Sequence, residues 1–122
     1  DHVGEIAAVR LRTGETLWSQ RRPTPYNTAA LTTAGGLVFV GDWDRYMFAY
    51  DALSGEQLWQ TRLPTMSNGF PITYAVDGKQ YVAVGAGPSV GGSSWATLIP
   101  LELFPEKHNP RAGNGVYVFA LP

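Results

Sequence analysis

A short motif that ends in tryptophan occurs twice in this chain, and the two copies stand 41 residues apart. The first copy, Thr13 to Trp18, reads TGETLW, and the second, Ser54 to Trp59, reads SGEQLW. A repeat of this length is typical of architectures in which small supersecondary units stack or close into a ring. Identity continues at the same spacing beyond the motif, at Arg21/Arg62, Pro23/Pro64, Thr24/Thr65, Asn27/Asn68 and Thr32/Thr73.

The apolar segments favour an all-β unit. The chain has 122 residues with 14 Gly and 9 Pro, and such frequent helix-breaking residues leave little room for long helices. Several apolar runs lack polar alternation, which indicates strands that are covered on both faces. The expected strands cover residues 5–9, 15–20, 29–33, 37–40, 45–50, 57–62, 70–74, 80–84 and 116–121.

These strands group into four-stranded antiparallel blades of a β-propeller. We expect residues 1–22 to end one blade, 23–62 to form a complete blade, and 63–122 to form the following blade with an insertion at 88–113. The chain would then open and close within a blade. Because fewer than three repeats rarely bury their terminal faces, we expect a piece of a larger ring or a subunit that completes a ring with other copies.

Composition excludes several classes of function. The formal net charge is −1 and no basic tract is present, so a nucleic-acid surface is not expected. There is no cysteine, which excludes a disulfide framework or a thiolate metal site. No apolar run reaches the roughly 18–20 residues that a membrane span requires, so we expect no membrane span in this chain.

Three segments resemble one family. The segment 49–59, AYDALSGEQLW, resembles the tryptophan-docking motif of the quinoprotein dehydrogenases, whose eight-bladed propellers hold pyrroloquinoline quinone and Ca²⁺. The segment 71–84, PITYAVDGKQYVAV, resembles a stretch near the C-terminus of the alcohol and sugar dehydrogenases of that family, and 34–39, AGGLVF, also fits. The resemblance fails mainly over 89–111. It implies about two blades of an eight-bladed ring.

The docking motif has a physical basis. A tryptophan at the same place in each blade can lie between neighbouring sheets and give its indole N–H to a carbonyl. The first copy departs from the pattern, with Arg10 where the second has Asp51. We therefore expect its turn to be less well specified.

The resemblance also implies a cofactor-facing surface. Asn27 aligns with a cofactor-contacting position, Asn68 is its counterpart in the next repeat, and Gly87, Gly91 and Gly92 belong to a glycine-rich loop that approaches the quinone. Glycine lets the backbone come close to a flat ligand. The alternatives are that both asparagines only shape their loops and that the glycine run is a flexible turn.

Two tryptophans in expected loops, Trp43 and Trp95, are candidates for lining a substrate entrance. For Trp43 the competing interpretation is packing against a neighbouring blade. The apolar segment 95–105 would form a lid or a contact with a partner, because an apolar insertion should be covered.

No catalytic or metal-binding residue is expected in this chain. Asp42 and Asp44 are too few for a calcium cage, and a solvated loop is the preferred interpretation. His2 and His108 have no neighbour at ligand spacing. The resemblance implies that the Ca²⁺ ligands and the catalytic aspartate lie outside this sequence.

The leading functional hypothesis is the C-terminal portion of a periplasmic dehydrogenase that depends on pyrroloquinoline quinone. It would oxidise a small alcohol or sugar and pass electrons to an acceptor protein or a quinone, and the cofactor would carry the chemistry. The chain alone would be inactive and would need the remaining blades. The alternative is a non-catalytic propeller scaffold that binds partners, or a ring closed by copies of the chain.

Overall fold

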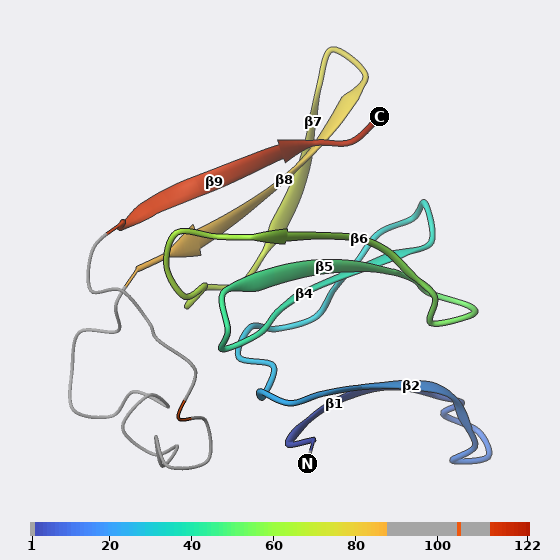
Figure 1. Ribbon diagram of the computed structural model, residues 1–122. Helices are drawn as coiled ribbons and strands as arrows, with labels where there is room; N and C mark the ends of the chain where they lie inside the picture. The colour runs from blue at the N-terminus through green and yellow to red at the C-terminus, as the bar shows by residue number, and fades with distance from the viewer. Residues whose placement is uncertain (1, 88–104, 106–112) are drawn as a thin grey trace.

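The computed structural model describes residues 2–87, 105 and 113–122, and it forms three antiparallel sheets that follow one another along the chain (Figure 1). The first sheet pairs β1 (Gly4–Val9) with β2 (Thr16–Arg22). The second has the order β3 (Leu31–Thr32), β4 (Leu37–Gly41), β5 (Tyr46–Asp51) and β6 (Gln57–Arg62). The third has the order β7 (Ile72–Val76), β8 (Lys79–Ala86) and β9 (Gly115–Ala120).

The strands lie within two residues of the expected bounds at each end; β3 is shortened to two residues, and β7 is shifted by two. β3 pairs over two residues only, because the chain before it bonds to the end of β4 through the N–H groups of Asn27 and Thr28, which both donate to Gly41 O. β7 begins two positions later than expected. Pro71 has no N–H to give to a ladder, so regular pairing starts at Ile72.

The two copies of the tryptophan motif make the same tight turn. Gly14 and Gly55 both have φ of 74°, a conformation that glycine adopts without strain. Gly14 N donates to Arg10 O at 2.8 Å, and Gly55 N donates to Asp51 O at 2.9 Å. The main chain of the turn is therefore the same in both copies, but Asp51 Oδ1 also accepts three hydrogen bonds from Leu53 and Ser54, which an arginine at the equivalent position cannot accept. The first turn is thus less well specified by its side chains, as expected.

The middle sheet is covered on both faces, as its apolar strands predict. Toward the first sheet, Val38, Val40, Phe48 and Tyr50 form a buried cluster. Toward the third sheet, two further clusters pack residues of β4, β5 and the segment after β6 against β8; they contain Phe39, Ala49 and Val82, and Met47, Leu63, Val84 and Ala86. The core therefore lies in the two interfaces between successive sheets.

Both repeated tryptophans lie at such interfaces. The Nε1 of Trp18 on β2 donates to Ala52 O at 3.0 Å, and a Cβ on Gly55 would come within 2.5 Å of the Trp18 ring. Trp59 on β6 meets Phe119 of β9 edge to face, with ring centroids 5.1 Å apart. Each tryptophan thus contacts the sheet that follows its own.

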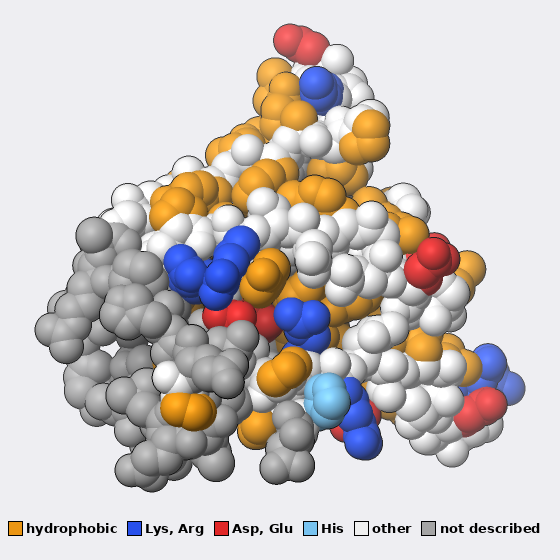
Figure 2. Space-filling model, in the orientation of Figure 1, with side chains coloured by type: hydrophobic (Ala, Val, Ile, Leu, Met, Phe, Trp, Pro, Cys, Tyr) orange, Lys and Arg blue, Asp and Glu red, His pale blue; other side chains and the backbone are white. Residues whose placement is uncertain are grey.

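The outer face of the third sheet carries exposed apolar side chains, and some of them are visible over the β7–β8 hairpin at the top of Figure 2. The first sheet differs there, since its outer face includes the ion pair between Arg21 and Glu5. The apolar residues of the outer face on β7 and β9 are Ile72, Tyr74, Val76, Val116 and Val118.

Candidate cofactor-facing loops

The loops that lead into β3 and β7 meet the ends of β4 and β8 in the same way. Tyr26 bridges Asp42, and Ser67 bridges Ala86. The N–H of Asn27 donates to Gly41 O at 3.0 Å, and that of Asn68 donates to Gly85 O at 3.2 Å. The repeat in sequence therefore places both asparagines at equivalent ends of successive sheets.

Asn27 joins two repeats through its side chain. Its Nδ2 donates to the carbonyl oxygen of Ser67 at 2.6 Å, which links the loop before β3 to the loop before β7. Its Oδ1 is buried and has no hydrogen-bond partner in the part of the chain that the structure describes. The Nδ2 group of Asn27 thus binds the backbone of the next repeat.

Asn68 holds the end of its own β8. Its Nδ2 donates to Gly87 O at 2.9 Å, and the N–H of Gly87 donates to Met66 O at 2.9 Å. A Cβ on Gly87 would come within 2.6 Å of Oδ1 of the exposed Asn114 side chain, which would have to move to accept it. Gly87 is therefore fixed on both sides where the expected glycine-rich loop begins.

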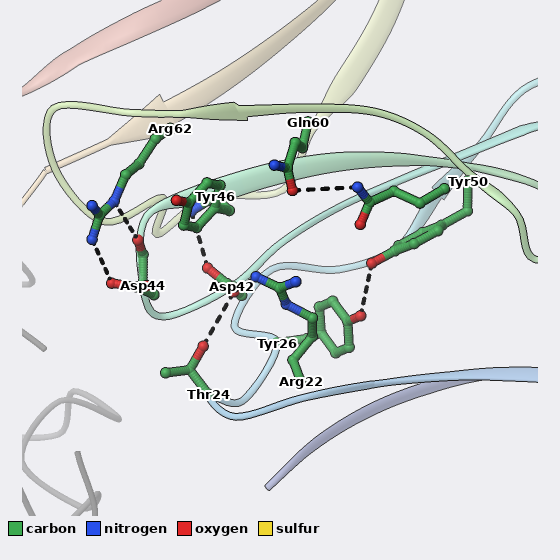
Figure 3. Close-up of polar contacts among 10 residues, drawn as sticks. Arg22, Thr24, Tyr26, Asp42, Asp44, Tyr46, Tyr50, Gln60 and Arg62 are labelled. Atoms are coloured by element: carbon green, nitrogen blue, oxygen red, sulfur yellow. Dashed lines mark hydrogen bonds and ion pairs between the residues drawn. The ribbon is translucent and has the colours of Figure 1, made fainter. Parts of the chain in front are cut away.

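Asp42, which the sequence interpretation placed in a solvated loop, is completely buried, and this expectation is wrong. Its Oδ2 accepts a hydrogen bond from Thr24 Oγ1 at 3.1 Å and lies 3.5 Å from the Arg22 guanidinium, while Oδ1 accepts from Tyr46 N at 3.0 Å (Figure 3). Burial raises the pKa of this carboxyl, and the Tyr46 N–H, Arg22 and Thr24 oppose the rise.

Arg22 reaches Asp42 from β2, so the ion pair crosses the interface between the first two sheets. Its guanidinium also lies 4.4 Å above the centroid of the Phe48 ring, a distance at which cation–π attraction operates. Arg22 retains 26% of its side-chain exposure. The sequence does not predict the pairing of Arg22 with Asp42, because the two residues belong to no common motif.

Two tyrosines extend this polar cluster. The hydroxyl oxygens of Tyr26 and Tyr50 lie 2.9 Å apart. Burial raises the pKa of both phenols above the ordinary value. Both side chains are therefore neutral hydrogen-bonding groups at neutral pH.

Asp44 is also buried, and a solvated position is wrong for it as well. Its Oδ1 accepts from Arg62 NH2 at 2.8 Å, and this pair lies within the middle sheet (Figure 3). The neighbouring aspartates therefore face different arginines. In the part of the chain that the structure describes, no three His, Cys, Asp or Glu side chains gather into a metal site.

The remaining predicted site residues divide into described and undescribed positions. Trp43 is 2% exposed, and its backbone N–H donates to Pro25 O at 2.9 Å. This burial favours the packing role, and a role at a substrate entrance stays a prediction. Gly91, Gly92 and Trp95 lie outside the described residues, as does His108.

A cavity of about 560 Å³ lies between the second and third sheets, away from the asparagine loops. Its lining includes Leu37, Trp59 and Leu121 and is apolar. Leu37 starts β4 and Gly41 ends it, so the cavity lies at the opposite end of the sheet from Asn27. It therefore plays no part in the candidate surface.

No helix in the described part of the chain is long and apolar enough to cross a membrane.

Comparison with known proteins gives consistent matches. Residues 2–82 match the model of the glucose/ethanol/alcohol dehydrogenase β-propeller domain, a family designated PQQ. A quinoprotein ethanol dehydrogenase from Pseudomonas aeruginosa is 35% identical over the whole chain, and a quinoprotein glucose dehydrogenase from Escherichia coli is 32% identical over 98% of it. The chain spans 19% and 16% of the lengths of these two relatives.

A solved structure extends the match to three dimensions. A europium-containing methanol dehydrogenase superimposes on 96% of the chain with a TM-score of 0.75 and 31% sequence identity, and the match covers 23% of that chain. The three antiparallel sheets thus have a counterpart in a propeller dehydrogenase.

Proposed function

Because this chain belongs to the glucose/ethanol/alcohol dehydrogenase β-propeller family, we propose that it forms part of a quinone-dependent dehydrogenase that oxidises an alcohol or sugar hydroxyl. In this proposal the chain supplies a section of the wall of the cofactor pocket. The observation that carries it is the convergence of Asn27, Asn68 and Gly87 at equivalent ends of successive sheets. Loops gathered at one end of a rigid scaffold are common places for binding sites.

The described residues suit pyrroloquinoline quinone, which is flat and anionic. Asn27 Nδ2 holds Ser67 O, so the loops before β3 and β7 present a fixed surface to a flat ligand. Gly87 presents only backbone, which permits close approach to a planar ring. When bound, the quinone supplies the oxidising power by taking the hydride equivalent of the alcohol.

Calcium is not supported by the same residues. The acidic side chains nearest to the candidate loops, Asp42 and Asp44, are buried and already face Arg22 and Arg62. Hard cations take several oxygen ligands at once, and these carboxylates are engaged elsewhere. We therefore assign no step to Ca²⁺ in this chain.

The proposal includes the ring. Residues 1–22, 23–62 and 63–122 are taken as parts of successive four-stranded blades, about two blades of an eight-bladed propeller. The contacts of Trp18 with Ala52 and of Trp59 with Phe119 support tryptophan docking between blades. The exposed apolar face of β7 and β9 suits a further sheet packed against it.

The substrate would be a small alcohol or sugar, the electron acceptor a protein or quinone, and the location the periplasm.

Cofactor titration tests the proposal. Pyrroloquinoline quinone is added with Ca²⁺ to the folded protein, preferably with the remaining blades, and binding is followed by the quinone absorbance. Saturable binding is expected. Failure to bind at high quinone concentration would contradict the dehydrogenase assignment and would favour a non-catalytic scaffold.

A further inference from the structure

Two asparagines that occupy the same place in successive repeats use their side chains to hold backbone carbonyls. Asn27 Nδ2 donates to Ser67 O at 2.6 Å, and Asn68 Nδ2 donates to Gly87 O at 2.9 Å. Both acceptors are main-chain atoms in the loops that form the candidate surface. The repeated amides are thus engaged with protein in this structure.

The two bonds are connected through the backbone between them. Ser67, which accepts from Asn27, pairs with Ala86 at the end of β8. Ala86 precedes Gly87, which accepts from Asn68 and donates its N–H to Met66 O. These contacts form a continuous connection from the loop before β3 to Gly87.

From these contacts we propose that Asn27 and Asn68 are positioning residues that set the location of Gly87 relative to the quinone. The proposal rests on the proposed function, and it assigns the asparagines a role through the backbone in place of direct contact with the cofactor. Gly87 accepts a hydrogen bond from Asn68 Nδ2 and donates its N–H to Met66 O, so its backbone is tied to these neighbours. Loss of either asparagine amide would leave the backbone of Gly87 less firmly held in this position.

The structure offers a matched control for a side-chain amide that links successive sheets. Gln20 Nε2 on β2 donates to Gly55 O at 2.8 Å, the same chemistry at the same kind of interface. Gly55 lies in the β5–β6 turn, whereas Gly41 and Asn27 lie at the other end of β5. Gln20 therefore measures the effect of losing such a bond far from the candidate surface.

The experiment compares Asn27→Ala, Asn68→Ala and Gln20→Ala in the holoprotein that includes the remaining blades. The readouts are the dissociation constant of pyrroloquinoline quinone, kcat and KM. Each asparagine variant is expected to weaken quinone binding about tenfold, because the loop that the lost hydrogen bond held must then be ordered when the quinone binds, at a cost comparable to the contribution of that bond. Gln20→Ala is expected to change it less than about twofold. The KM for the alcohol should be unchanged, because neither asparagine is assigned a contact with the substrate.

Amide hydrogen exchange without the quinone separates positioning from contact. In Asn68→Ala, the N–H groups of Asn68 and Gly87 are expected to exchange faster, whereas a residue that only touched the cofactor would leave them unchanged. Asn27→Ser and Asn68→Ser retain a hydroxyl donor. They replace the alanine variants in the same measurements if those variants fail to fold. They are expected to recover part of the lost affinity.

Three results would overturn the inference. They are quinone binding by both asparagine variants as tight as that of the wild type, equal weakening of binding by Gln20→Ala, and unchanged exchange at Gly87. Each of these outcomes would leave the proposed function intact, provided that the wild type binds the quinone. Absence of binding by the wild type would instead overturn the proposed function and this role with it.

Discussion

The carboxylate of Asp42 and the guanidinium of Arg22 lie 3.5 Å apart across the interface between the first and second sheets. At the next interface the corresponding places hold Leu63, one repeat after Arg22, and Ala86, which bridges Ser67 as Asp42 bridges Tyr26. Leu63 and Ala86 belong to one buried apolar cluster. The same kind of interface is thus closed by an ion pair in one case and by apolar packing in the other.

This exchange predicts strong coupling between the two positions. Arg22→Leu alone should lower the free energy of unfolding by about 3 kcal/mol, because it leaves the buried Asp42 carboxylate without its counter-ion, and Asp42→Ala alone should lower it by less, because Arg22 remains partly exposed to water. The double variant Arg22→Leu/Asp42→Ala should lie within about 1 kcal/mol of the wild type. Urea unfolding measures all three values.

The exposed pair of Arg21 and Glu5 provides the control for the coupling measurement. Arg21→Leu should cost at most about 1 kcal/mol, since water screens that pair. Costs of the two single variants that simply add in the double variant would refute the coupling.

Two aspartates should contribute to the pH dependence of stability with slopes of opposite sign. Burial raises the pKa of Asp42 above 3.8 in the folded state, so the free energy of unfolding falls as the pH rises from 3.8 through the raised value. The Ser54 and Leu53 hydrogen bonds lower the pKa of Asp51, so its stabilisation is present above 3.8 and is lost as the pH falls through the lowered value.

Asp42→Asn should therefore remove a downward slope with rising pH, and Asp51→Asn should remove an upward slope below pH 3.8. Chemical denaturation of the wild type and both variants, from about pH 3 to pH 7, measures the slopes. A wild-type curve whose slope Asp42→Asn leaves unaltered would show that burial does not perturb this carboxyl.

Gly55 and Gly14 allow the cost of a ring contact to be separated from the cost of backbone conformation. Both have φ of 74°, yet an added Cβ meets the Trp18 ring at Gly55 and nothing within 4 Å at Gly14. Gly14→Ala should cost about 1–2 kcal/mol from the left-handed backbone alone. Gly55→Ala should cost about 1–3 kcal/mol more, because the ring must move.

Thermal or urea unfolding compares the two glycine variants, and Trp18 fluorescence should shift only in Gly55→Ala. Equal costs with unchanged fluorescence would mean that Trp18 does not rest against Gly55 in solution.

The hydrogen bond from Trp18 Nε1 to Ala52 O is testable by Trp18→Phe, which keeps an aromatic ring but removes the donor. We expect a loss of about 1 kcal/mol in the free energy of unfolding, the usual net value of one such bond. Leu17→Ala on the same strand, at an exposed position, should change stability by about 0.5 kcal/mol or less. An equal effect of both substitutions would contradict a specific role for the indole N–H.

Sequence predicted most of the strands because the repeat marks them twice. The TGETLW and SGEQLW copies place β2 and β6, and their glycines place the turns before them. Short-range chemistry of this kind depends on neighbours along the chain. The shift of β7 shows the limit, since Pro71 removes a ladder bond that the apolar pattern does not report.

The site was less predictable because its contacts join different repeats. The position of Asn27 follows from its repetition as Asn68, but its bond to Ser67 depends on how the third sheet is placed beside the second. A solvated Asp42 is expected from the sequence because two aspartates are too few for a cation cage, and the repeat does not reveal the partner of Asp42, since Arg22 is replaced by Leu63 in the next copy. When equivalent places in successive interfaces hold different residue types, the sequence repeat does not reveal the contacts there.

A structure of the protein with pyrroloquinoline quinone bound tests the central claim most directly. The account predicts that the quinone lies against the loops that carry Asn27 and Gly87, with Asn27 Nδ2 still on Ser67 O and Asn68 Nδ2 still on Gly87 O. A quinone bound elsewhere, such as in the apolar cavity beside Trp59, would contradict the account.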